Sequence, residues 1–417
     1  MRRTRRRAVG AVAAAGMERP AGAVGGGGLS VRLALVIQRY FPHGGLQRDC
    51  RALLTELLAR GHACRVYCRD WRGEPVAGAQ LRRLPARGLG NHRRDADFAR
   101  RVVADLAADT PAQRVDGVIG FNPMPGLDVY FAGDGSFIAR HAASRPLYRL
   151  TPRYRARAAL ERAVFDPAAA TQVLLLTAAQ AEEYRRCHGT PPQRLHVLPA
   201  GLEPGRRPPR DERERARLRA ALRSELGLAR GELALLLVAS SFATKGLDRA
   251  IAALAHLLAQ QPEVAVRLLV AGPGNPHRYR RLARRLRVAR RVQFLGARDD
   301  VPALMLAADL LLHPGREEAG GVVLLEAIAA GLPLVASGLC GYAAQVEEAR
   351  AGIVLPRPFA QAQLDAALLR NLDGVFRAQR RECALRYAVG ADLYRRHAVA
   401  ANLVETLLRQ RREARGG

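Results

Sequence analysis

Residues 233–260 read LALLLVASSFATKGLDRAIAALAHLLAQ, and this stretch decides the fold class. It opens with an uninterrupted apolar run at 233–238, which is typical of a strand buried on both faces in a parallel sheet. A turn of small residues that ends in Lys245 and Gly246 follows, and apolar residues then recur at helical spacing up to residue 260. A strand, a small-residue turn and a helix in this order predict one unit of a doubly wound α/β domain.

The same alternation of strands and helices continues on both sides of this stretch. On the C-terminal side it predicts strands at 266–271, 292–295, 309–312 and 333–337 and a helix near 322–330. On the N-terminal side it predicts strands at 31–37, 63–68, 115–121, 128–131 and 173–176 and a helix at 46–60. We therefore expect an α/β protein of two Rossmann-like domains that face one interdomain cleft.

The expected domain bounds follow from where this pattern restarts. A segment rich in arginine and proline at 203–210 separates the two halves, so the first domain should span residues 31–204 and the second 205–384. Residues 1–30 read as a disordered or misassigned extension. Residues 385–417 read as a helical segment that crosses between the domains.

The overall composition excludes a membrane-spanning protein and indicates an acidic partner. The 417 residues carry a formal net charge of +29, which requires an acidic partner or an acidic surface. No stretch reaches the roughly 18 uninterrupted apolar residues of a membrane span. The six cysteines contain no C-x-x-C pair, which favours a reducing, cytosolic compartment and predicts no zinc site.

Two segments concentrate the positive charge. Between residues 138 and 165, seven arginines alternate with aromatic and leucine side chains around one acid, Glu161. Guanidinium groups interleaved with aromatic rings suit anionic lipid headgroups, although a plain solvated helix face is the alternative. Residues 277–291 hold eight arginines and no acid, but no nucleic-acid-binding motif accompanies either segment. The membrane surface is therefore favoured over nucleic acid as a partner.

Lys245 is the one lysine among the 67 lysines and arginines of the chain. It lies in the turn after an expected strand, where an α/β enzyme can hold a phosphate with a compact point charge. The alternative is that an arginine-rich composition retained a single lysine by chance. Position alone leaves both explanations open.

The most specific local pattern lies at residues 314–327, PGREEAGGVVLLEA. Glu326 follows Glu318 by eight residues, close to two helical turns, so we expect both carboxylates on one side. Gly320 and Gly321 allow backbone N–H groups to approach a ligand at the expected start of a helix, which favours a phosphate. Carboxylates beside a phosphate suit hydroxyl-rich groups such as a sugar and a ribose. First-turn acids favoured by the helix dipole are the alternative explanation.

These features together resemble the retaining glycosyltransferases of family 4, which have the two-domain GT-B fold. The shared features are E-x7-E, a lysine after a strand and a Gly-Gly loop after the first strand. Longer strings are similar to the lipopolysaccharide core glucosyltransferase I group of Gram-negative bacteria, and the similarity extends from residue 31 to about 395. These strings are YFPHGGLQRD at 40–49, FNPMPGLDVYF at 121–131, LYRLTPRY at 147–154, AADLLLHP at 307–314 and GLPLVASGLCGY at 331–342.

The resemblance implies an activity and its partners. Such enzymes transfer glucose from UDP-glucose to the inner-core heptose of a lipid-anchored lipopolysaccharide acceptor, with retention at the anomeric carbon. They use no metal and no further cofactor. They work on the cytoplasmic face of the inner membrane as peripheral proteins. The segment at 138–165 corresponds to their membrane-contacting region, which implies contacts by Arg149, Arg153, Tyr154, Arg155 and Arg157.

The resemblance also implies a role for each matching residue. Glu318 would contact the hydroxyls of the donor sugar, and Glu326 the uridine ribose. Lys245 would neutralise the diphosphate leaving group, helped by backbone amides of Ala319, Gly320, Gly321 and Val322. Gly44 and Gly45 would let a loop of the first domain close over the phosphates. The acceptor side would be lined by Asp49 and Asp134, with Asp134 included among the catalytic residues.

One departure and three alternatives accompany this prediction. The related enzymes carry an arginine before the lysine, but this chain has Thr244, so Arg298 or an arginine from 278–291 would have to compensate. A family 4 enzyme that transfers another sugar to another cell-surface glycan is the nearest alternative. A GT-B epimerase would need a histidine–carboxylate pair, and the sequence nominates none. An anionic-lipid-binding protein with an inactive cleft is the alternative from a different class.

Overall fold

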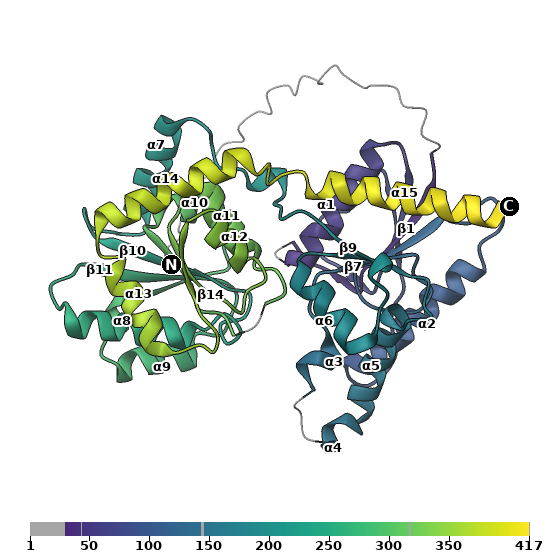
Figure 1. The fold of residues 1–417 in the computed structure, drawn as a ribbon, viewed down its shortest axis with the longest axis horizontal. Helices are drawn as coiled ribbons and strands as arrows, with labels where there is room; N and C mark the ends of the chain where they lie inside the picture. The colour runs from purple at the N-terminus through teal and green to yellow at the C-terminus, as the bar shows by residue number, and fades with distance from the viewer. Residues whose placement is uncertain (1–29, 43, 143–145, 317, 417) are drawn as a thin grey trace, which may run out of the picture.

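The computed structural model describes residues 30–42, 44–142, 146–316 and 318–416, and Figure 1 shows two α/β lobes side by side. Residues 1–29 of the expected N-terminal extension lie outside the described residues. Each lobe is built on one parallel sheet, as the alternation of strands and helices predicts. The residue bounds proposed above for the domains remain predictions.

The N-terminal lobe holds a seven-stranded sheet in the order β5-β3-β1-β6-β7-β8-β9. The strands are β1 (Arg32–Val36), β3 (Ala63–Cys68), β5 (Ala79–Arg83), β6 (Gly117–Gly120), β7 (Val129–Ala132), β8 (Gln172–Leu175) and β9 (Leu195–Val197). The helices are α1 (Gly45–Ala59), α2 (Asn91–Ala107), α3 (Phe137–Arg140), α4 (Pro146–Arg149), α5 (Pro152–Phe165) and α6 (Ala178–His188). A short parallel pair, β2 (Arg39–Tyr40) and β4 (Asp70–Trp71), and the 3-10 turn η1 (Pro192–Arg194) complete it.

The C-terminal lobe holds a six-stranded sheet in the order β12-β11-β10-β13-β14-β15. The strands are β10 (Leu233–Val238), β11 (Val266–Ala271), β12 (Val292–Gly296), β13 (Leu310–His313), β14 (Leu334–Ser337) and β15 (Gly352–Leu355). The helices are α7 (Glu212–Glu225), α8 (Leu247–Gln260), α9 (His277–Arg285), α10 (Val301–Ala307), α11 (Val322–Ala330), α12 (Ala343–Glu348), α13 (Gln361–Arg370) and α14 (Gly374–Gly390). The 3-10 turns are η2 (Pro204–Arg206) and η3 (Ala289–Arg291).

Most of the strands that the sequence predicts are buried, whereas the edge strand β12, predicted at 292–295, is half-buried or exposed at every position. The opening run at 233–238 forms β10, which pairs with β11 and β13 in the centre of its sheet and is buried except for the half-buried Val238. The outer strands β5, β9 and β15 have no comparable signal in the sequence, because their side chains are half-buried or exposed at most positions. Hydrophobic patterning finds strands most readily where the sheet buries them.

The chain returns to the N-terminal lobe at its C-terminal end. Helix α14 packs on α11, and α15 (Arg396–Gly416) packs on α1, as the yellow ribbon in Figure 1 shows. The N–H of Leu202 in the connecting segment donates to the carbonyl of Leu393 at 2.6 Å. The two connections therefore lie side by side between the lobes.

The first arginine-rich segment forms α3, α4 and α5, with α4 at the far tip of the N-terminal lobe (Figure 1). Leu147 and Leu150 at this tip are 78% and 59% exposed, and Arg149, Arg153 and Arg155 are also exposed. Tyr154 and Arg157 differ from the prediction. The Tyr154 ring is buried against Phe137, and Arg157 lies over the Phe137 ring and 3.9 Å from Asp95, so both side chains face the protein.

Within the described part of the chain, none of the helices has both the length and the apolar character that crossing a bilayer requires.

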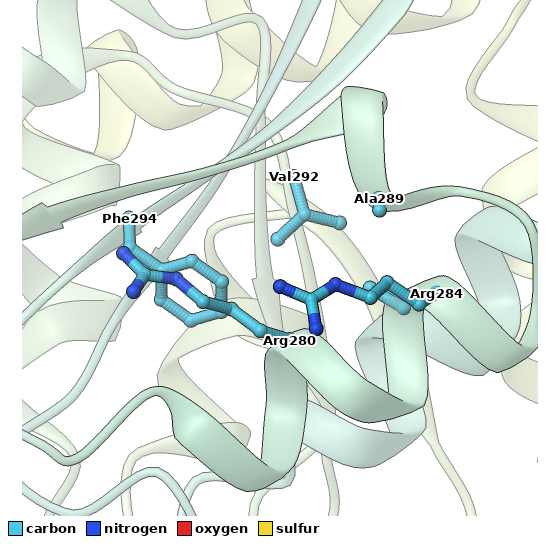
Figure 2. Close-up of a pocket in the computed structure, with 6 residues that line it drawn as sticks. Arg280, Arg284, Ala289, Val292 and Phe294 are labelled. Atoms are coloured by element: carbon cyan, nitrogen blue, oxygen red, sulfur yellow. The ribbon is translucent and has the colours of Figure 1, made fainter.

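The second basic segment lies at the outer edge of the C-terminal sheet. It forms α9 and η3, which border a pocket of about 190 Å³ against edge strand β12 (Figure 2). The guanidinium of Arg280 lies over the Phe294 ring, with 5.4 Å between its carbon and the ring centroid. Arg284 also lines this pocket, but no carboxylate does. This pocket therefore lacks the acids that the sequence assigns to sugar recognition.

Candidate active site

Two loops at the carboxyl ends of neighbouring strands bring the predicted donor-site residues together. One loop joins β10 to α8 and carries Lys245, and the other joins β13 to α11 and carries Glu318. The N–H of Arg316 donates to the Thr244 carbonyl at 2.8 Å. Gly246 has a φ of +71°, and a Cβ there would lie 2.1 Å from the Pro314 carbonyl oxygen. Only glycine allows this close approach of the two loops.

The carboxylate of Glu318 lies between two cationic partners. Its Oε1 forms an ion pair with Nζ of Lys245, and its Oε2 accepts a 2.7 Å hydrogen bond from Nε2 of His313. The Glu318 side chain is 19% exposed, the Lys245 side chain 13% and the His313 side chain 0%. The carboxylate and the ammonium are therefore reachable from solvent, whereas the histidine supports them from inside.

These contacts fix the charge of the cluster. Burial by itself raises the pKa of Glu318, but the charge and hydrogen bond of His313, followed by those of Lys245, lower it to about 2. Burial by itself lowers the pKa of His313, but Cys340 and Glu318 raise it to about 9. At neutral pH, Glu318 is therefore an anion that only accepts hydrogen bonds, and His313 is an imidazolium.

The loop that contains Glu318 is not helical, which corrects one expectation. Glu318 forms an isolated parallel bridge with Cys340, and Gly321, at φ +91°, is the N-cap of α11, which begins at Val322. Glu318 and Glu326 therefore do not share one helical face, although their spacing suggested it. The helix begins at Val322, four residues after Glu318, so helical periodicity does not apply between the two glutamates.

Backbone contacts set the shape of the glycine-containing loop at 318–321. The N–H of Gly341 donates to the Glu318 carbonyl at 2.9 Å, and the N–H of Tyr342 donates to the Gly320 carbonyl at 2.7 Å. A Cβ on Gly341 would lie 1.8 Å from the Ala319 carbonyl oxygen. These bonds engage the carbonyl groups of the loop. The first N–H groups of a helix have no intrahelical acceptor and are suited to an anion.

Glu326 lies where the lobes meet. It is buried in α11, and its Oε1 lies 3.7 Å from Nη1 of Arg48 and 3.5 Å from Nη1 of Arg206. Arg48 belongs to α1 of the N-terminal lobe, so Glu326 contributes to the interface between the lobes. The same oxygen has no hydrogen-bond partner among the described residues.

The predicted residues of the N-terminal lobe separate into two groups. Gly44 is the N-cap of α1 and Gly45 its first residue, and a Cβ on Gly45 would meet no atom within 4 Å. Asp134 follows β7 with an exposed side chain, while its backbone carbonyl accepts from Tyr184 at 3.0 Å. Open space at Gly45 and an exposed acid after β7 are compatible with the predicted roles, which remain predictions.

Asp49 differs from Asp134, because its carboxylate is enclosed. Its side chain is 6% exposed and forms an ion pair with Arg396 and a 3.0 Å contact with Nε2 of His397. Arg396 in turn donates from Nη1 to the hydroxyl of Tyr342 at 3.0 Å. The assignment of Asp49 to the acceptor side stays a prediction, and in this structure its carboxylate is enclosed. Its carboxylate joins α1 to α15 and, through Arg396, to the C-terminal lobe.

Comparisons with known proteins identify the family of this chain. Residues 43–206 match the family model described as Glycosyltransferase Family 4, and residues 219–382 match the model described as Glycosyl transferases group 1. The chain is 40% identical over 374 residues to the lipopolysaccharide glucosyltransferase WaaG of Escherichia coli K12, covering 89% of this chain and 98% of that protein. The chain belongs to the WaaG family of glycosyltransferases.

Comparison with solved structures identifies the fold. The crystal structure of WaaG superimposes with a TM-score of 0.84 at 39% identity, covering 89% of this chain and 99% of that one. A sucrose-phosphate synthase from Thermosynechococcus elongatus superimposes with a TM-score of 0.73 at 20% identity, covering 92% and 100%, which shows the fold alone. The fold is GT-B, so the expected α/β class and its two Rossmann-like domains are confirmed.

One side chain of the candidate glycosyltransferase site, His313, was not predicted from the sequence. His313 ends the string AADLLLHP, and no histidine–carboxylate set could be nominated from the sequence. The structure brings such side chains together in His313–Glu318 and His397–Asp49. The available signal was a polar residue at the end of the apolar run at 309–312, since the carboxyl ends of parallel strands surround the site.

Arg298, which could compensate for the missing arginine, pairs with acids in this structure, and its compensating role stays a prediction. Its guanidinium binds Asp300 at 2.6 Å and lies 3.4 Å from Glu225. Arg249 lies nearer to the lysine loop, where its Nη1 donates to the Pro314 carbonyl at 3.0 Å. Lys245 and the His313 imidazolium are the cationic groups in contact with Glu318.

Proposed function

We propose that this glycosyltransferase transfers glucose from UDP-glucose to an inner-core heptose of lipopolysaccharide, with retention at the anomeric carbon and without a metal ion. The observation that carries the proposal is the Glu318 carboxylate, held at the start of α11 between Lys245 and His313. The name of the Escherichia coli relative, a lipopolysaccharide glucosyltransferase, supports the sugar and the acceptor.

The three side chains divide the work of donor binding. The ammonium of Lys245 is a compact cation that can exchange its contact with Glu318 for a diphosphate oxygen. The Glu318 oxygen released in this exchange then accepts hydrogen bonds from sugar hydroxyls, for which an anion with a pKa of about 2 is suited. His313 keeps the second oxygen in place throughout.

The reaction breaks one bond and forms another at the anomeric carbon. The bond from this carbon to the diphosphate oxygen breaks, and a bond to the acceptor hydroxyl oxygen forms. The proton of that hydroxyl passes to the departing diphosphate. Lys245 and the N–H groups at 319–322 stabilise the charge that develops on the diphosphate. Gly44 and Gly45 allow the α1 loop to approach the phosphates, and Glu326 binds the ribose once Arg48 and Arg206 reorient.

The acceptor places the enzyme on the cytoplasmic face of the inner membrane in this proposal. Leu147 and Leu150 expose apolar side chains beside the exposed Arg149, Arg153 and Arg155. Leucines enter the lipid boundary while guanidinium groups bind phosphate headgroups. Replacing these three arginines with glutamine should reduce binding to vesicles of anionic lipid in a sedimentation assay. The matched control is Arg157→Gln, since Arg157 faces the protein, and equal loss in both variants would oppose the proposal.

The alternative within the family is a transferase that uses a different sugar nucleotide as its donor. A D-inositol 3-phosphate glycosyltransferase of Nocardia farcinica is 32% identical over 196 residues, which cover 45% of this chain and 42% of that protein. This match shows that a transferase named for another acceptor has a sequence similar to about half of this chain. Hexose epimers differ in one or two hydrogen bonds, so the donor has to be measured.

The experiment is a panel of nucleotide sugars tested with truncated lipopolysaccharide cores. Transfer of glucose from UDP-glucose to the heptose-terminated core, with an α linkage in the product and activity in the presence of a chelator, is the expected result. Transfer of another sugar would favour the alternative donor. Vesicle binding without transfer of any sugar would favour a lipid-binding protein with an inactive cleft.

A further inference from the structure

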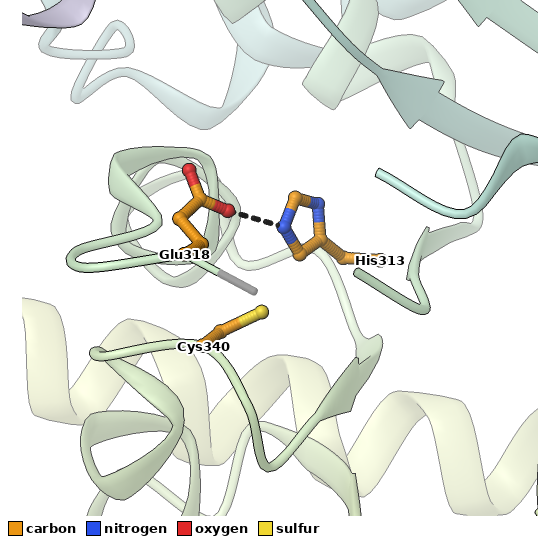
Figure 3. A group of neighbouring side chains, drawn as sticks. All are labelled: His313, Glu318 and Cys340. Carbon is orange, nitrogen blue, oxygen red and sulfur yellow. Dashed lines mark hydrogen bonds and ion pairs between the residues drawn. The ribbon is translucent and has the colours of Figure 1, made fainter. Parts of the chain in front are cut away.

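The side chains of His313 and Cys340 converge on the Glu318 carboxylate. His313 ends β13, Glu318 lies in the following loop, and Cys340 lies in the loop after β14 (Figure 3). One nitrogen of His313, one carboxylate oxygen of Glu318 and Sγ of Cys340 all lie within 4.8 Å of one another. Neither the diphosphate contact nor the sugar contact proposed above uses the Cys340 sulfur.

The backbone holds these residues in place without a metal ion. Strands β13 and β14 are parallel neighbours, with His313 paired to Ala336. The bridge between Glu318 and Cys340 then joins the two loops beyond the strand ends. His313 and Cys340 are 0% and 1% exposed, so their side chains have little freedom to move. The three ligand types are therefore preorganised.

Space is available next to the ligand atoms. A Cβ on Gly315 would lie 3.4 Å from Sγ of Cys340 and 3.5 Å from Nε2 of His313. A Cβ on Gly321 would lie 3.5 Å from Oε2 of Glu318. Each glycine therefore leaves room beside a ligand atom that a larger side chain would occupy. Ligand atoms within 4.8 Å of one another are close enough to share one ion, because metal–ligand bonds are about 2.0–2.3 Å long.

We propose that His313, Glu318 and Cys340 bind a thiophilic divalent cation of the Zn²⁺ class. Imidazole nitrogen, carboxylate oxygen and thiolate sulfur are the ligands that such ions prefer, and three protein ligands leave one tetrahedral position for water. On binding, the proton on Nε2 of His313 and the thiol proton of Cys340 pass to solvent. A thiolate and a carboxylate then balance the charge of the divalent ion.

The consequence for transfer rests on the proposed function. An ion bound to Glu318 takes the oxygen that would receive the sugar hydroxyls, and it repels the ammonium of Lys245. The metal-bound state is therefore inhibited. The absence of a C-x-x-C pair predicts no zinc site, but it bears only on sites with paired cysteines, whereas this cluster has a single cysteine.

The experiment titrates Co²⁺, and then Zn²⁺ as a competitor, into the full-length protein after chelator treatment. Tetrahedral Co²⁺ bound by a thiolate should give a sulfur-to-cobalt charge-transfer band that Zn²⁺ removes. Cys340→Ser should abolish the band and weaken Zn²⁺ binding by roughly 100-fold or more. The matched controls Cys187→Ser and Cys383→Ser should keep it, since both cysteines lie outside the cluster. Absence of the band, or a band that survives Cys340→Ser, would overturn the proposal.

Two further variants separate the metal site from the transferase site. Gly315→Ala keeps all three ligands but fills the space beside them, so it should weaken Co²⁺ binding. Lys245→Met removes the ammonium beside Glu318, so it should tighten Co²⁺ binding while it lowers transfer. Weaker Co²⁺ binding by Lys245→Met than by the parent protein would contradict the assigned site. If the band is present but no sugar is transferred, the metal site stands and the proposed function fails.

Discussion

Two carboxylates in this molecule have the same kinds of partner and different accessibility. Glu318 lies between Lys245 and His313, and Asp49 lies between Arg396 and His397. The Glu318 side chain is 19% exposed, and its partner Lys245 carries the ammonium at the end of a flexible side chain in a loop. The Asp49 side chain is 6% exposed, and its cation is also bonded to Tyr342. An accessible ion pair can exchange a partner for a ligand, whereas an enclosed pair holds elements together.

The largest expected effect is on the enclosed pair. Arg396→Met should lower the free energy of unfolding by about 3–5 kcal/mol, because it leaves the buried Asp49 carboxylate without its counter-charge. Urea unfolding measures this change. The double variant with Asp49→Asn should recover most of the loss, since no uncompensated charge then remains. If Arg396→Met alone were as stable as the parent, the enclosed pair would not hold the fold together, and the proposed difference between the two carboxylates would fail.

Glu318→Ala tests the accessible carboxylate. It should lower kcat by about 100- to 1,000-fold, as loss of a positioned charged group in an active site typically does. Unfolding by urea should change far less than in Arg396→Met. The matched control is Glu382→Ala, because that side chain is 75% exposed and lies in α14. An unchanged kcat in Glu318→Ala would contradict the assignment of Glu318 to the donor site.

Lys245→Arg tests whether the shape of the cation matters at the accessible site. It keeps the charge but replaces a compact ammonium with a planar fork, so we expect a loss of about tenfold in kcat/KM. Steady-state kinetics with varied UDP-glucose measure it. Activity equal to that of the parent would mean that any cation at this position suffices.

The smallest expected effect is a pH dependence of stability at Asp49. Burial by itself raises the pKa of Asp49, but the charge of Arg396 and then the hydrogen bond of His397 lower it below its ordinary value. The stabilisation is therefore complete above the unfolded-state pKa of about 3.9 and is lost as pH falls through the folded-state pKa. Unfolding followed between pH 6 and acid should show a shallower loss in Asp49→Asn than in the parent.

The sequence-based strand predictions were most accurate for buried strands, although the edge strand β12 was also predicted. Buried strands such as β10 and β11 were predicted at their observed bounds, because apolar runs report burial directly. The half-buried β15 had no comparable signal. The pairing of Lys245 with Glu318 follows from two motifs at strand ends of one sheet. The enclosure of Asp49 was missed, because Arg396 lies 347 residues away in the chain.

The sequence by itself determined the α/β class, the two Rossmann-like halves and the loops in which the glycosyltransferase carries its charged residues. These are local properties, set by apolar periodicity and by glycine positions within a few residues. Only the tertiary structure decided which neighbours each carboxylate has. His313 and Cys340 reach Glu318 because β13 and β14 are adjacent, and Arg396 reaches Asp49 because α15 packs on α1. Charge, accessibility and metal-ligand geometry depend on such long-range contacts, which no local pattern in a single chain encodes.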